Sequence, residues 1–112
     1  MTCREIPENE PSINGLEEIA DHYGFGAQSN QLIEECAELI QAVNKYKRAI
    51  TKCGQPLEDY NSTIVLDNLV EEIADVEVML EQIKYLLGIN EEDIRELKKF
   101  KINRTLGKMG RR

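Results

Sequence analysis

A chain of 112 residues with 41% apolar residues is long enough to form one compact domain. Aromatic residues make up only 5% of the chain and tryptophan is absent, so aliphatic side chains must fill the core. The net charge of −7 argues against binding to nucleic acid polymers, and no apolar run approaches the roughly 18 residues of a membrane span.

The cysteine count is odd, and the spacing of Cys3, Cys36 and Cys53 fits neither a zinc site nor a disulfide framework. Reduced thiols in a reducing compartment are the simplest account. The N-terminus shows no charged-then-apolar signal segment. We therefore expect a soluble, cytoplasmic protein that does not interact with membranes.

Two segments are predicted at the start of the chain. Residues 1–11 contain two prolines among polar residues and are expected to form a flexible N-terminal arm. Residues 12–112 are expected to form a single helical domain, which begins with a short helix over about 15–23. Gly24 and Gly26 are predicted to end this helix.

Two long helices are predicted to follow. The first is capped by Ser29 or Asn30 and reaches about Ile50, where a breaker cluster over residues 51–56 ends it. The second runs over 62–87 and is stopped by a glycine.

A last helix completes the pattern. Asn90 is predicted to cap it, three acids occupy its first turn, and it reaches about Leu106. No stretch shows the alternation typical of strands. The expected fold is therefore all-α, a four-helix bundle with two long antiparallel helices. The helix over 62–87 is apolar over an arc wider than a two-helix seam needs, which favours assembly into an oligomer.

Glu72 is the most informative residue of the chain. At about 100° per residue it falls on the same face as Val65, Val76 and Ile83, where an aliphatic residue belongs. Because an unpaired buried carboxylate is costly, a partner is required. Asp75 follows at the edge of the same face.

The preceding long helix repeats this spacing. Glu35 lies at the rim of an apolar arc that includes Leu32 and Leu39, and Glu38 lies one step outward. Antiparallel packing of the two helices is expected to bring the two acidic pairs together. Four carboxylates facing one another are typical of a site for a hard divalent cation such as Mg²⁺ or Mn²⁺.

The two acidic segments also resemble a known signature. Glu34-Glu35-Cys36-Ala37-Glu38, followed by Glu72-Ile73-Ala74-Asp75, is similar to the EExxE…ExxD pattern of the MazG-like, all-α nucleoside triphosphate pyrophosphohydrolases. The resemblance covers roughly residues 24–106. Residues 39–71 separate the two halves by more positions than is usual in the family, and the excess is assigned to the loop around 51–61.

The resemblance implies a Mg²⁺-dependent enzyme that cleaves a nucleoside triphosphate, favouring a deoxynucleotide, between its α and β phosphates. It implies the metal ligands Glu35, Glu38, Glu72 and Asp75, and a catalytic role for Glu34 and Glu35. It also implies homodimers or homotetramers.

Polar residues outside the acidic motif are candidates for binding the substrate. The acidic site needs cations from elsewhere to hold the phosphates of a polyanion, and Lys101, Arg104 and Lys45 are candidates. Gln28 is a candidate for contact with the base or sugar.

Three alternatives remain open from the residues. The acids can form the charged seam of a non-catalytic helical interaction module. A related pyrophosphohydrolase can act on phosphoribosyl-ATP. A ferritin-like di-iron protein needs Glu-x-x-His pairs, whereas Ile19 lies three residues before the lone His22.

Overall fold

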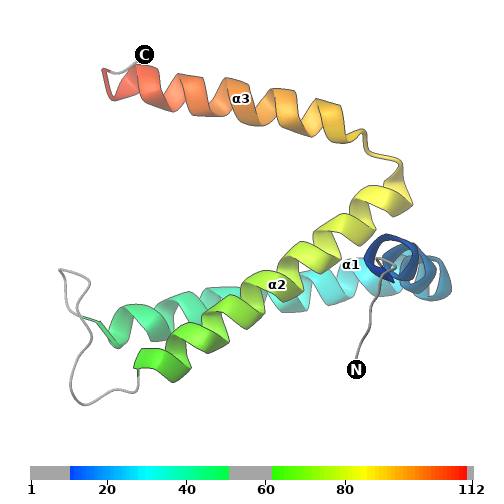
Figure 1. Ribbon diagram of the computed structural model, residues 1–112, viewed down its shortest axis with the longest axis horizontal. Coiled ribbons are helices and arrows are strands. Elements are labelled where there is room, and N and C mark those ends of the chain that lie inside the picture. The colour runs from blue at the N-terminus through cyan, green and yellow to red at the C-terminus, as the bar shows by residue number, and fades with distance from the viewer. Residues whose placement is uncertain (1–10, 51–61, 111–112) are drawn as a thin grey trace.

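The computed structural model describes residues 11–50 and 62–110, and these residues form three helices and no strand. The helices are α1 (Pro11–Arg48), α2 (Ser62–Leu87) and α3 (Glu91–Lys108) (Figure 1). The all-helical class is therefore confirmed. The four-helix bundle is not, because the first two predicted helices are joined into α1 and α3 does not pack along the other two.

Only α1 and α2 pack together extensively in the described part of the chain. They run side by side in opposite directions, while α3 turns away from the end of α2 and leaves an open V (Figure 1). The prediction of two long antiparallel helices is thereby confirmed. The buried side chains lie mainly along this α1–α2 seam and are small or flexible, including Ala42, Val76 and Met79.

A kink divides α1 at the position where a helix end was predicted. Gly24 has φ 82° and ψ 169°, a backbone conformation that only glycine adopts readily. The chain resumes the helix directly afterwards, so the predicted cap at Ser29 or Asn30 is wrong. Ser29 lies inside the helix, where its hydroxyl donates a hydrogen bond to the Gly26 carbonyl oxygen.

The other predicted boundaries are close to the observed ones. α2 has the predicted bounds, α1 ends two residues before Ile50, and α3 continues two residues beyond Leu106. α1 begins at Pro11 rather than near residue 15, which suits the fixed φ of proline at a first helical position. The arm was predicted over 1–11, and its last residue, Pro11, belongs to α1 instead, while the rest of it lies outside the described residues. The predicted long loop over 51–61 also lies outside the described residues.

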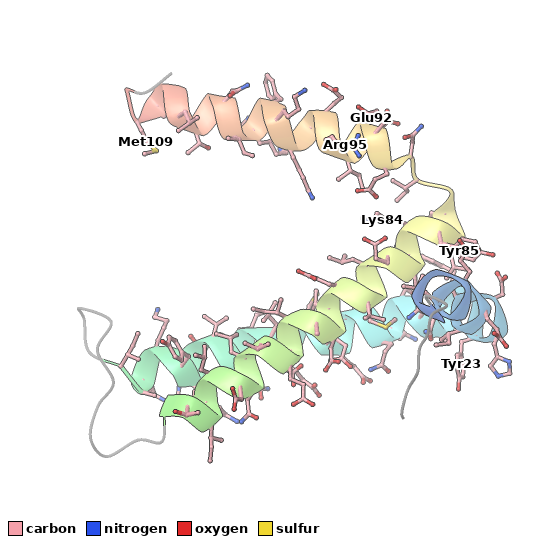
Figure 2. All side chains as sticks on the ribbon, viewed as in Figure 1. Tyr23, Lys84, Tyr85, Glu92, Arg95 and Met109 are labelled. Atoms are coloured by element: carbon pink, nitrogen blue, oxygen red, sulfur yellow. The ribbon has the colours of Figure 1, made fainter. Side chains whose placement is uncertain are left out.

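The turn between α2 and α3 is held by local contacts. Gly88 takes a positive φ of 65°, and the Asn90 side chain accepts a hydrogen bond from the Glu92 backbone N–H, which confirms the predicted cap. Lys84 bridges Glu81 at 2.8 Å and Glu91 at 3.0 Å, near the end of α2 (Figure 2). Hydrogen bonding to Lys84 lowers the pKa of Glu91.

No helix in residues 11–50 and 62–110 is long and apolar enough to cross a membrane. Cys36, the one cysteine among these residues, is a half-buried free thiol on α1.

The kink gives a test of the fold. Replacing Gly24 with alanine should lower the free energy of unfolding by about 1–3 kcal/mol, because a side chain is strained at this positive φ. Gly26→Ala is the matched control: Gly26 is helical with open space around its Cα, so alanine should be neutral or stabilise by up to about 1 kcal/mol. Urea unfolding followed by circular dichroism measures both. Equal changes in the free energy of unfolding for the two variants would contradict the kink at Gly24.

Candidate metal and substrate site

Three of the four predicted ligands meet across the α1–α2 seam. Glu35 and Glu38 project from α1 and Glu72 from α2, and one carboxylate oxygen of each lies within 4.8 Å of the other two. On α1 the two glutamates share a face because they are three residues apart. Antiparallel packing then places Glu72 opposite them, so residues far apart in the sequence form one cluster.

This spacing is close to what one small cation requires. Two oxygens on opposite sides of an octahedral Mg²⁺, each at about 2.0–2.1 Å from the ion, lie about 4.2 Å apart. The three carboxylate oxygens of the cluster lie within 4.8 Å of one another, which is compatible with that span. Its donors are all carboxylate oxygens, which suit Mg²⁺ or Mn²⁺ rather than zinc or copper.

Two of the carboxylates have a buried oxygen without a partner. Oε1 of Glu35 and Oε1 of Glu72 are shielded from solvent and receive no hydrogen bond. Burial raises the pKa of Glu72, and the negative charges of Glu38, Asp75 and Glu35 raise it further. A bound cation would remove both problems, since it would supply the missing partner and neutralise the repulsion.

The remaining acids of the motif lie around this cluster. Asp75 is half-buried and close enough for its charge to act on Glu72, but it is not part of the three-residue group. Glu34 is exposed on α1 and also lies outside the group. The structure thus brings Glu35, Glu38 and Glu72 together and leaves Asp75 and Glu34 beside them.

A pocket of about 240 Å³ opens next to the carboxylates, with Glu38 and Glu72 in its wall. Its other lining residues come from both helices: Gln41, Ala42, Lys45, Val65, Asn68 and Glu71. Lys45, one of the predicted candidates for binding phosphate, therefore places a positive charge in the pocket wall beside the acidic cluster. The carboxamides of Gln41 and Asn68 were not predicted. Asn68 lies four residues before Glu72, and this helical spacing could have indicated it.

Gln31 is another residue that the sequence reasoning missed. Its Nε2 donates a 2.8 Å hydrogen bond to Oε2 of Glu35 from one turn earlier on α1. This bond holds Oε2 of Glu35, whereas Oε1, the buried oxygen, receives no hydrogen bond. A glutamine four residues before a glutamate lies on the same helix face, so this spacing could have predicted the hydrogen bond.

The other predicted substrate-binding residues lie elsewhere. Gln28 is buried, and its Nε2 donates a 2.8 Å hydrogen bond to Oε1 of Gln82 across the seam. Lys101 and Arg104 are exposed on α3, and the Arg104 guanidinium lies over the Phe100 ring, 5.7 Å from its centre. None of these residues lines the pocket beside the carboxylates.

Comparisons of the chain with protein-family models, with curated proteins and with solved structures give no match.

The crowding of carboxylates predicts a specific response to metal. Glu72→Gln should raise the melting temperature of the metal-free protein, because it removes a charge that its neighbours disfavour. Mg²⁺ should raise the melting temperature of the wild type more than that of this variant. Glu77→Gln, an exposed change on the same helix, is the control and should leave the response to Mg²⁺ intact. Melting temperatures measured with EDTA and with Mg²⁺ test this prediction. A wild type whose melting temperature does not change with divalent ions would contradict the metal site.

Proposed function

We propose that this protein is a Mg²⁺-dependent nucleoside triphosphate pyrophosphohydrolase of the MazG-like class, which releases a nucleoside monophosphate and pyrophosphate. The observation that carries the proposal is the convergence of Glu35, Glu38 and Glu72 from two helices, with two buried oxygens lacking partners. The EExxE…ExxD pattern supports it because the clustered residues are motif positions.

Each acidic residue has a proposed task. Glu35, Glu38 and Glu72 would hold the cation, and Asp75 would be a further ligand from the adjacent turn of α2. When bound, the ion would polarise the phosphate oxygens and lower the pKa of the attacking water. Glu34, together with Glu35, orients that water and accepts its proton as the bond between the α and β phosphates breaks.

The pocket beside the carboxylates is the proposed place for the substrate. A triphosphate carries about four negative charges near neutral pH, so it requires a cation in addition to the metal. Lys45 supplies one within the pocket wall. In this proposal Gln28 holds the two helices together through its hydrogen bond to Gln82. Lys101 and Arg104 would contact substrate bound to another subunit of a homodimer or homotetramer, since α3 does not pack extensively on α1 or α2.

Loss of a central ligand should abolish turnover. Loss of a residue that merely supports a metal ligand costs about 10–100-fold, so Glu72→Gln should lower kcat by at least about 100-fold. Glu77→Gln should retain activity, because Glu77 is exposed and does not belong to the cluster. The assay measures pyrophosphate and phosphate released from a panel of nucleoside triphosphates with Mg²⁺.

The result of that assay separates the proposal from its rivals. Pyrophosphate without phosphate, lost in Glu72→Gln, supports the proposed bond cleavage. Normal turnover by the variant would contradict the assignment of Glu72. Turnover of phosphoribosyl-ATP alone would favour the related enzyme, and no turnover of any substrate would favour the interaction module.

Lys45 gives a separate test of the substrate pocket. Lys45→Met should raise KM by about tenfold or more, because a charge-assisted hydrogen bond to phosphate is worth about 1.5–3 kcal/mol. Lys47→Met is the matched control: Lys47 is an exposed lysine two residues away that does not line the pocket. Steady-state kinetics measure both variants. Equal KM values for the two variants would remove Lys45 from the proposed site.

A further inference from the structure

A second pocket, of about 490 Å³, lies near the end of α2, where residues from all three helices and from the turn before α3 come together. We call it the junction pocket. Its wall includes Leu16, Glu17, Glu81, Lys84, Tyr85 and Ile89. Lys84 follows Glu72 by twelve residues on α2, which is about 18 Å along the helix axis. The junction pocket is therefore separate from the metal and substrate site.

The junction pocket offers apolar surface that solvent can reach. Tyr85 is 38% accessible, Ile89 is 43% accessible and Leu16 is half-buried. The Tyr85 hydroxyl donates a 2.7 Å hydrogen bond to Oδ2 of Asp21, so the polar end of this side chain already has a partner (Figure 2). A pocket of this volume with several apolar side chains in its wall is of the size that holds a small organic molecule.

The charges in the wall of the junction pocket are mainly negative. Glu17, Glu81 and Glu91 line it together with a single lysine, Lys84. Lys84 bridges Glu81 and Glu91, and its hydrogen bonds to these two carboxylates raise its pKa. Glu17 is half-buried and forms no hydrogen bond or ion pair with another residue in the described part of the chain. Its negative charge contributes to the raised pKa of Tyr85. The wall therefore contains one carboxylate that no cation of the described residues neutralises.

We infer that the junction pocket binds a small organic amine, which consists of a protonated amino group on an apolar body. The ammonium group donates hydrogen bonds to Glu17. The apolar body packs against Leu16, Ile89 and the ring of Tyr85. An anionic ligand fits this wall less well, because Lys84 is already neutralised by two carboxylates and the unpaired charge is negative.

An amine in the junction pocket would add contacts where the described chain has few of them. α3 does not pack extensively on α1 or α2, and the pocket wall includes residues from all three. Binding should therefore raise the melting temperature of the protein. The inference does not depend on the proposed function, because amine binding is measured with EDTA present and without nucleotide.

The first experiment compares two probes of similar size and opposite charge. Phenethylamine carries an ammonium group at neutral pH, whereas 3-phenylpropionate carries a carboxylate on the same kind of ring. In titrations of the ¹⁵N-labelled protein followed by NMR, phenethylamine should shift the amide signals of Leu16, Lys84 and Ile89 and saturate at millimolar concentration. 3-Phenylpropionate should bind at least about tenfold more weakly. Equal Kd values for the two probes, or shifts centred on Glu38 and Glu72 instead, would overturn the inference.

The second experiment removes the charge that the amine is inferred to contact. Glu17→Gln keeps the shape of the side chain and should raise the Kd for phenethylamine about tenfold. Glu18→Gln is the matched control, because Glu18 is the neighbouring, exposed glutamate and does not line the pocket, so its Kd should equal that of the wild type. An unchanged Kd in Glu17→Gln would overturn the inference.

A variant of the apolar wall provides a test that does not depend on Glu17. Ile89→Ala shortens an exposed side chain in the turn before α3 and should raise the Kd for phenethylamine several-fold, because the ring loses apolar contact. The NMR spectrum of each variant shows whether it is folded. If Glu17→Gln does not fold, an unchanged Kd in Ile89→Ala would overturn the inference.

Discussion

Electrostatic repulsion within the α1–α2 seam is the constraint on which the site depends. The packing of two amphipathic helices leaves Glu35 and Glu72 half-buried, and each has one oxygen that is shielded from solvent and lacks a hydrogen-bond partner. Carboxylates so placed destabilise the metal-free fold, as the raised pKa of Glu72 indicates. A bound cation would relieve this repulsion. The free energy of unfolding is therefore expected to increase when the protein binds metal.

The seam itself is narrow. Its buried side chains are alanines, Val76, Met79 and a pair of glutamines, and no large side chain in the described residues is fully buried. The Gln28–Gln82 hydrogen bond satisfies two polar groups that would otherwise be costly in this position. A hydrogen bond from Tyr85 to Asp21 ties the first part of α1 to the end of α2. These contacts position the two helices but bury little apolar surface.

The pocket beside the carboxylates lies on one side of the α1–α2 seam. Its wall combines the acidic side chains with Lys45 and with two carboxamides, and it has the concave shape that the proposed phosphate ester requires. α3 does not pack extensively on α1 or α2, and it carries basic residues from Lys98 onward.

The amino-acid sequence alone determined the helices and their faces. The bounds of α2, the cap at Asn90, the interruption at Gly24 and the position of Glu72 on an apolar face all follow from short-range signals. Periodicity and capping depend on residues within a few turns, which is why they could be predicted. The failed cap at Ser29 shows the limit of this reasoning, because a glycine can kink a helix without ending it.

Only the tertiary structure decided which of these faces meet. The register between α1 and α2 brings Glu72 to Glu35 and Glu38, leaves Asp75 outside the group and places Lys45 in the pocket wall. It also buries Gln28 against Gln82 and directs α3 away from the seam. These outcomes depend on packing between residues that are far apart in the chain. The helical repeat determines the face on which a side chain lies, but it does not determine which residue packs against that side chain.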